Sequence, residues 1–173
     1  MRLDDDDFSL FGLPRQQAQQ RAEIDARWKA LQAKVHPDKF SAEGAASQRQ
    51  AMQWALRVNE AHQRLRDPLK RAAYLCELRG VPLLANENTR MPASFLMEQM
   101  AWREGLDEAA TLAEVQSIDD QVAARETALL AEVGQLLDEA DDAPAAAAQV
   151  RALMFIAKFR SDIDKRLEAL ENQ

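Results

Sequence analysis

Three consecutive residues, His36, Pro37 and Asp38, combine a titratable imidazole, a rigid turn and a carboxylate. Proline lacks an amide hydrogen and disfavours helix in the residue before it, so these residues predict the abrupt end of a helix and an exposed tip. By itself such a tripeptide is most simply a helix terminator whose aspartate bonds nearby backbone. As a binding element, Asp38 can pair with a cation on another protein and His36 can hydrogen-bond, while Pro37 keeps both side chains in place.

An enzymatic role for this tip is the first alternative, with His36 as a general base oriented by Asp38. The chain has two histidines, no recognisable nucleophile motif and no glycine-rich phosphate loop, and an exposed tip does not desolvate a substrate. The single cysteine, Cys76, cannot form a disulfide or a cysteine-rich metal site within one chain. We therefore expect no catalytic residue, no metal site and no cofactor.

The elements that must position the tip are helices. Ile24, Trp28, Leu31 and Val35 have the spacing of one buried helical face, and the apolar positions from Met52 to Leu65 predict a second, antiparallel helix. Asp67-Pro68 predicts the start of a shorter helix that Gly80 and Pro82 end. The run Asp4 to Asp7 is expected to be a solvated lead-in to a short helix beginning near Phe8.

Three segments carry a resemblance to the J-domain: FSLFGLP at 8–14, VHPDKF at 35–40 and VNEAHQRLRDPLKRAAY at 58–74. With LFGLP near the start, HPDKF at the tip and FLMEQM at 95–100, the chain further resembles the HscB co-chaperones. This resemblance implies an L-shaped protein of two helical domains. It also implies that the protein delivers the iron–sulfur scaffold IscU to the DnaK-type chaperone HscA and stimulates its ATP hydrolysis.

The expected contact with the chaperone ATPase consists of the tip and a basic helix face that steers the encounter. Its residues are His36, Pro37, Asp38, Lys34, Lys29, Arg27 and Lys39. Two positions depart from the J-domain pattern. Lys29 is followed by Ala30 rather than by a second basic residue, and His62 stands where an aromatic residue is common, so we interpret it as a partly buried packing histidine.

The second half of the chain predicts three further helices, at about Pro92 to Gly105, from Leu112 through Leu136, and from Pro144 to Leu170. Together they predict an antiparallel three-helix bundle. The expected fold class is all-α, with a J-domain at 1–79, a packed linker at 80–91 that includes Leu83 and Leu84, and the bundle at 92–173.

The helix that follows Pro92 has two apolar sides. Angular spacing puts Phe95, Trp102 and Leu106 together and puts Leu96, Met97 and Met100 nearly opposite, and one three-helix core cannot bury both. The second side either packs against the J-domain or the linker leucines, or binds a partner, for which adaptable methionines are suited. The HscB resemblance assigns scaffold binding to Leu96, Met97, Met100 and Phe155, with Arg103 and Glu104 as candidate polar rim residues.

Charge and composition favour a protein partner. The formal net charge is −7, but residues 8–80 hold 13 basic against 7 acidic side chains and residues 81–142 hold 3 against 14. The negative overall charge disfavours binding to nucleic acid, and no apolar run approaches the roughly 20 residues of a membrane span.

We expect a cytoplasmic monomer. The live alternative is a J-domain co-chaperone for another client, with the bundle as a generic interaction or dimerisation module.

Overall fold

The computed structural model describes residues 1–83 and 90–173, and within these ranges every regular element is a helix. Contacts divide the chain into two compact units, Met1–Leu75 and Cys76–Gln173. This division falls inside a helix, a few residues before the expected domain limit at 79. Residues 84–89 of the expected linker, Leu84 among them, lie outside the described residues, so the linker stays a prediction.

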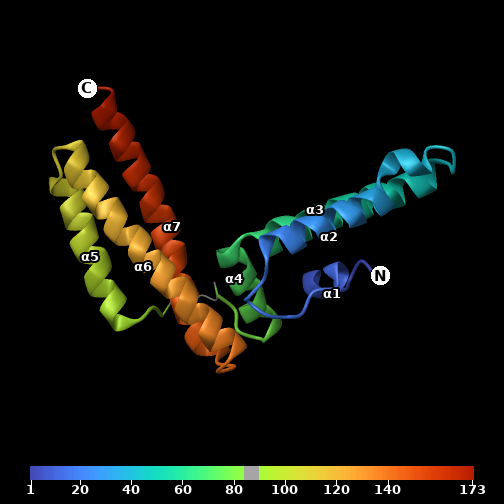
Figure 1. Ribbon diagram of the computed structural model, residues 1–173, viewed down its shortest axis with the longest axis horizontal. Helices are drawn as coiled ribbons and strands as arrows, with labels where there is room; N and C mark the ends of the chain where they lie inside the picture. Colours follow the sequence, from blue (N-terminus) through green and yellow to red (C-terminus); the bar gives the residue numbers. More distant parts are fainter. Residues whose placement is uncertain (84–89) are drawn as a thin grey trace. The chain divides into compact units, whose positions relative to one another are not determined.

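The first unit is a helical hairpin with short flanking helices (Figure 1). Helices α2 (Arg21–Val35) and α3 (Ala45–Arg66) pack along each other and are joined through a single 3-10 turn, η1 (Pro37–Phe40). Helix α1 (Asp7–Phe11) contacts both of them. Phe8, Ile24, Val58 and Leu65 are fully buried between these elements and form the centre of the core.

The N-terminal acids are not all solvated, so that expectation is wrong for Asp6 and Asp7. Asp6 caps α1, because its Oδ1 accepts from the Ser9 amide at 3.1 Å. Asp7 has no exposed surface, and its carboxylate lies 2.8 Å from the Arg57 guanidinium and 3.2 Å from that of Arg64. These two arginines are seven residues apart on α3 and therefore share a side, which pairs the buried carboxylate twice.

Helix α4 (Pro68–Leu78) begins and ends at the predicted signals. The Asp67 carboxylate accepts from the amides of Leu69 and Lys70 at 2.9 and 3.1 Å, as an N-cap does. After Leu78 the chain turns through Gly80 at φ 80°, a left-handed conformation that glycine adopts without strain. Local capping chemistry therefore sets both limits of α4.

His62 packs inside the hairpin, as predicted. Its ring stacks on Trp28 with centroids 4.4 Å apart, and its Nε2 lies 2.7 Å from the Asp25 carboxylate. This hydrogen bond holds the pKa of the Asp25 carboxyl below its usual value. His62 thus joins α2 and α3 in the place of a larger aromatic residue.

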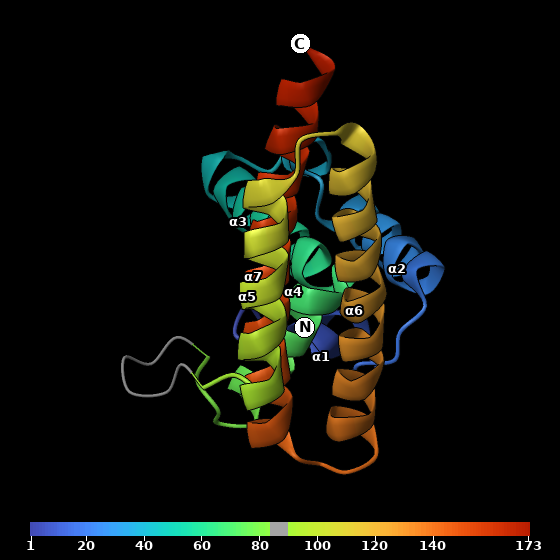
Figure 2. The same cartoon turned by 90° about the vertical axis from the view of Figure 1, so that its left-hand side faces the viewer.

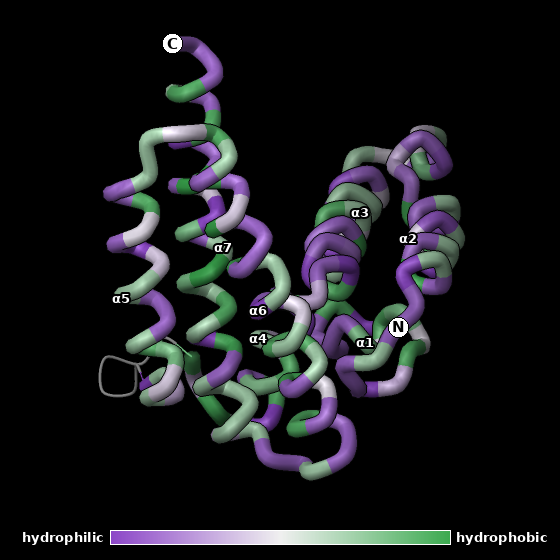
Figure 3. The backbone as a smooth tube through the Cα atoms, turned by 60° about the vertical axis from the view of Figure 1, so that its left-hand side comes forward, coloured by the Kyte–Doolittle hydropathy of each residue, from purple (hydrophilic) through white to green (hydrophobic). Residues whose placement is uncertain are grey.

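The second unit is the expected three-helix bundle, formed by α5 (Ala93–Glu108), α6 (Leu112–Asp138) and α7 (Ala143–Glu171) (Figures 1 and 2). Hydrophobic and hydrophilic residues alternate around each of its helices (Figure 3). Side chains without exposed surface fill the centre: Phe95, Val115, Val122, Leu129, Val133, Ile156, Phe159 and Ile163. No described helix is long and apolar enough to cross a membrane.

Two of the bundle helices start with caps. Thr111 and Glu114 form a capping box at α6, and Asp142 accepts from the Ala145 amide at the start of α7. Helix α5 instead differs from expectation at its end, because it continues past Gly105 to Glu108. A β-carbon at Gly105 would lie 3.3 Å from Ile118 Cδ1, so this glycine serves close approach to α6 and does not end the helix.

Candidate functional site

The tip between α2 and α3 displays the side chains that the sequence singled out. His36 has φ −60° and ψ 128°, which ends α2 in extended backbone, and η1 starts at Pro37. The His36 side chain is 53% exposed and that of Asp38 is 92% exposed. Both groups therefore face solvent at the end of the hairpin and can be reached by another protein.

A hydrogen bond within the tip orients the imidazole. His36 Nδ1 accepts from the Asp38 amide at 3.2 Å and also lies 3.6 Å from the Asp38 carboxylate. A neutral imidazole that accepts through Nδ1 carries its proton on Nε2. The ring thus offers an N–H donor beside an exposed carboxylate. Among the described residues no group of three or more His, Cys, Asp or Glu side chains is placed to hold a metal ion.

The predicted cations do not share one face of α2. Arg27 and Lys34 are seven residues apart and lie on the same side, whereas Lys29 is about 160° from Arg27 around a helix of 3.6 residues per turn. The Arg27 guanidinium donates to the carbonyls of Phe11 and Gly12, each at 3.2 Å. Arg27 therefore holds the end of α1 as well as carrying charge. Lys29, Lys34 and Lys39 are exposed.

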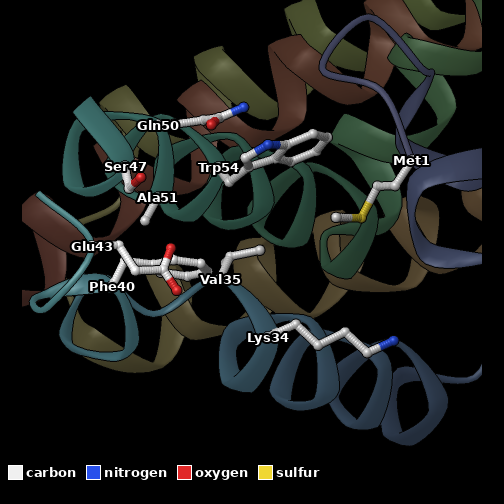
Figure 4. Close-up of a pocket in the computed structure, with 9 residues that line it drawn as sticks. All are labelled: Met1, Lys34, Val35, Phe40, Glu43, Ser47, Gln50, Ala51 and Trp54. Atoms are coloured by element: carbon white, nitrogen blue, oxygen red, sulfur yellow. The ribbon is translucent and has the colours of Figure 1, made fainter.

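A cavity of about 300 Å³ lies beside the tip and was not anticipated from the sequence (Figure 4). Val35 and Phe40, which flank the tip, lie on one side of it, and Trp54 of α3 lies on the other. Lys34 and Glu43 add charge to the lining. In the sequence Phe40 is distinctive only as part of HPDKF, and no spacing pattern singles out Trp54. At this volume the cavity is at the lower limit of small-molecule sites.

Helix α5 has the two faces that its spacing predicts. Phe95, Trp102 and Leu106 are at most 9% exposed. On the other side Leu96 is 44%, Met97 72% and Met100 68% exposed. The last three form what we call the α5 apolar face. Exposed unbranched thioethers suit a partner surface, because they repack at low cost.

Phe155 of α7, the fourth predicted scaffold-binding residue, is half-buried against α5. Its ring meets that of Phe95 edge-on at 5.7 Å and stacks on Phe159 at 5.9 Å. The Arg103 guanidinium lies 5.7 and 5.5 Å from the rings of Phe155 and Phe159. Arg103 therefore packs its guanidinium against the rings of Phe155 and Phe159 and is not only a solvated charge at the border of the surface. Glu104, the other predicted rim residue, is exposed.

A helical hairpin that presents a His-Pro-Asp tip is the arrangement of a J-domain, and it places the chain in the class of J-domain co-chaperones. Comparison with known proteins supports this class and narrows it. Residues 91–164 match a family described as the HSCB C-terminal oligomerisation domain. A co-chaperone protein HscB homolog of Burkholderia thailandensis is 48% identical, with 98% of each chain covered.

Solved structures agree. Chaperone HscB from Vibrio cholerae has a TM-score of 0.82 and 35% identity, covering 96% of this chain and 99% of that one. Human co-chaperone protein HscB has a TM-score of 0.86 and 27% identity, covering 96% and 84%. The chain belongs to the HscB family of co-chaperones.

Proposed function

We propose that this protein stimulates the ATPase of the DnaK-type chaperone HscA through its tip and delivers the iron–sulfur scaffold IscU through its bundle, promoting cluster transfer. One observation carries the proposal: the chain displays two chemically different groups of exposed side chains on two separate compact units. The polar tip has an exposed imidazole and carboxylate, and the α5 apolar face has three exposed aliphatic or thioether side chains. In this proposal residues 1–79 bind the chaperone and residues 92–173 bind the scaffold.

At the tip the proposed mechanism needs no chemistry from this chain. Asp38 forms an ion pair with a cation of the chaperone, and the His36 Nε2–H donates to an acceptor beside it. Pro37 and the bond from the Asp38 amide to His36 Nδ1 hold the tip backbone and the imidazole in place before the encounter, which lowers the entropy lost on binding. The tip binds the hydrolysis-competent state of the chaperone more tightly than its other states. This difference in affinity shifts the chaperone population toward the hydrolysis-competent state.

At the bundle, Leu96, Met97 and Met100 supply apolar area, and Phe155 with Arg103 supplies an aromatic and cationic border. Burial of such a cluster at the centre of an interface gives most of the affinity in protein complexes.

The single free cysteine, Cys76, is buried and needs no oxidising compartment, in keeping with a cytoplasmic setting.

The alternative is that the bundle serves another client or self-association. It is favoured by one observation, the description of the matching family as an oligomerisation domain. Sedimentation of the purified chain, alone and with IscU, separates the two possibilities. A monomer that forms a complex with IscU supports scaffold delivery, and a stable dimer that excludes IscU supports the alternative.

The test of the tip is the substitution His36→Gln, with Asp38→Asn as a second variant. Both keep the size of the side chain and remove the imidazole or the charge. We expect loss of HscA ATPase stimulation, with helicity and IscU affinity unchanged. Gln63→Ala, an exposed position on α3, is the matched control. Full stimulation by either tip variant would contradict the proposed mechanism.

A further inference from the structure

Arg151 is a buried arginine whose hydrogen-bond partners, in the part of the chain that the structure describes, are backbone carbonyls outside the helices. It lies on α7 and is 7% exposed. Its Nε donates to the Leu83 carbonyl at 3.1 Å, one terminal nitrogen donates to the Arg90 carbonyl at 3.1 Å, and the other donates to the Pro82 carbonyl at 3.2 Å. One planar guanidinium thus binds backbone on both sides of residues 84–89.

These bonds satisfy backbone groups that have no helix to bond to. Pro82 and Leu83 follow the end of α4, and Arg90 precedes Pro92, the N-cap of α5. Leu83 is buried, and a buried carbonyl without a donor costs free energy, whereas Pro82 and Arg90 are exposed residues. A guanidinium supplies up to five N–H groups in a fixed plane, so one side chain can bond all three carbonyls. Arg151 therefore ties the backbone of Pro82, Leu83 and Arg90 to α7.

The same stretch of α7 contacts α5 one helical turn further on. Phe155 is four residues after Arg151, and its ring meets that of Phe95 in the first turn of α5. Arg151 and Phe155 therefore hold the entry and the first turn of α5 against one side of α7. Leu96 and Met97 follow Phe95 on the same helix, so their position relative to Phe155 depends on this placement.

We propose that Arg151 is a positioning residue for client binding: through the Arg90 carbonyl, two residues before the N-cap Pro92, it holds the start of α5 against α7, so that the α5 apolar face and Phe155 form one continuous surface. The inference rests on the proposed function for the identity of the client. Arg151 itself is not expected to contact the client, because its guanidinium is buried and donates to carbonyls of this chain.

The test uses Arg151→Met, which keeps the apolar stem and removes all five donors, and Arg151→Lys, which keeps the charge but not the planar fork. Arg160→Met is the matched control, because Arg160 is also on α7 but forms its ion pairs with Asp119 and Glu126 of α6. For both Arg151 variants we expect IscU affinity to fall about tenfold, the effect of displacing one or two anchor side chains. HscA stimulation in the absence of IscU should not change.

Two further readouts separate positioning from general stability. Amide hydrogen exchange in the first turn of α5 should quicken in the Arg151 variants, while exchange in the middle of α6 stays as in the control. In Arg151→Ala, ethylguanidinium added well below denaturing concentration should restore IscU affinity, and ethylammonium at the same concentration should not.

Unchanged affinity in both Arg151 variants overturns the proposal, and so does weakened affinity with unchanged exchange in α5. Should Arg151→Met fail to fold, Arg151→Lys decides by the same readouts. If the unsubstituted chain does not bind IscU, the proposed function fails, but hydrogen exchange still tests whether Arg151 positions α5.

Discussion

Truncating the exposed methionines of α5 gives a direct test of the client surface. Met97 is 72% and Met100 is 68% exposed, so most of each side chain remains to be buried by a partner. Full burial of a methionine side chain is worth about 1.5–3 kcal/mol, so about two thirds of it gives about 1–2 kcal/mol for each residue. Met97→Ala and Met100→Ala should therefore each weaken IscU binding about 5- to 30-fold.

Isothermal titration of each variant with purified IscU measures the effect. The folded chain should lose little, because a truncation at an exposed helix position changes the free energy of unfolding by about 0.5 kcal/mol or less. Met52→Ala is the matched control, since Met52 is an equally long side chain on α3 that is 62% exposed. It removes similar exposed area from the first unit and should leave IscU affinity unchanged.

The reasoning is refuted if both α5 variants bind IscU as tightly as the unsubstituted chain. It is also refuted if Met52→Ala weakens binding to the same extent, because loss of exposed apolar area anywhere would then explain the result. A large loss of thermal stability in Met97→Ala or Met100→Ala would show that these side chains support the bundle itself.

Two other predictions concern titratable groups in the second unit. The Glu114 carboxylate accepts from the amides of Ala110 and Thr111 at 2.7 and 3.2 Å, and these bonds hold its pKa below the usual 4.5. Its contribution to stability is complete above the unfolded pKa and is lost as the pH falls through the lower folded pKa. Thermal melts from about pH 5 to about pH 3 should therefore show a shallower decline for Glu114→Gln than for the unsubstituted chain; equal slopes would contradict this cause. Burial raises the pKa of the Cys76 thiol to about 11, so a thiol reagent at about pH 8 should label Cys76 only as the chain unfolds, and rapid labelling of the folded chain would contradict the burial.

Local signals in the sequence were sufficient wherever backbone chemistry decides the structure. Pro37 ends α2, and Asp67-Pro68 starts α4, because the missing amide and the capping carboxylate act over one or two residues. The two faces of α5 were also predictable, since they follow from helical spacing alone. The positions of Met97 and Met100 on the exposed side confirm that prediction.

Features that depend on contacts between distant residues were missed. Gly105 predicts the end of a helix, yet it marks the point where α5 approaches Ile118 of α6. Arg27 has the charge expected of a steering residue, but only the fold brings the carbonyls of Phe11 and Gly12 to its guanidinium. Arg151 is one arginine among many in the sequence, and only the fold brings the carbonyls of Leu83 and Arg90 to it.

The use of thioethers on the α5 apolar face brings a chemical liability that leucine would not. Peroxide transfers an oxygen atom to an accessible methionine sulfur and gives a polar, chiral sulfoxide. Met97 and Met100 are open to such oxidants, whereas Phe95 on the opposite side is sealed in the core. The helix would stay folded while its outer surface became polar, so oxidation at this surface would weaken the proposed binding of IscU before it harmed the fold.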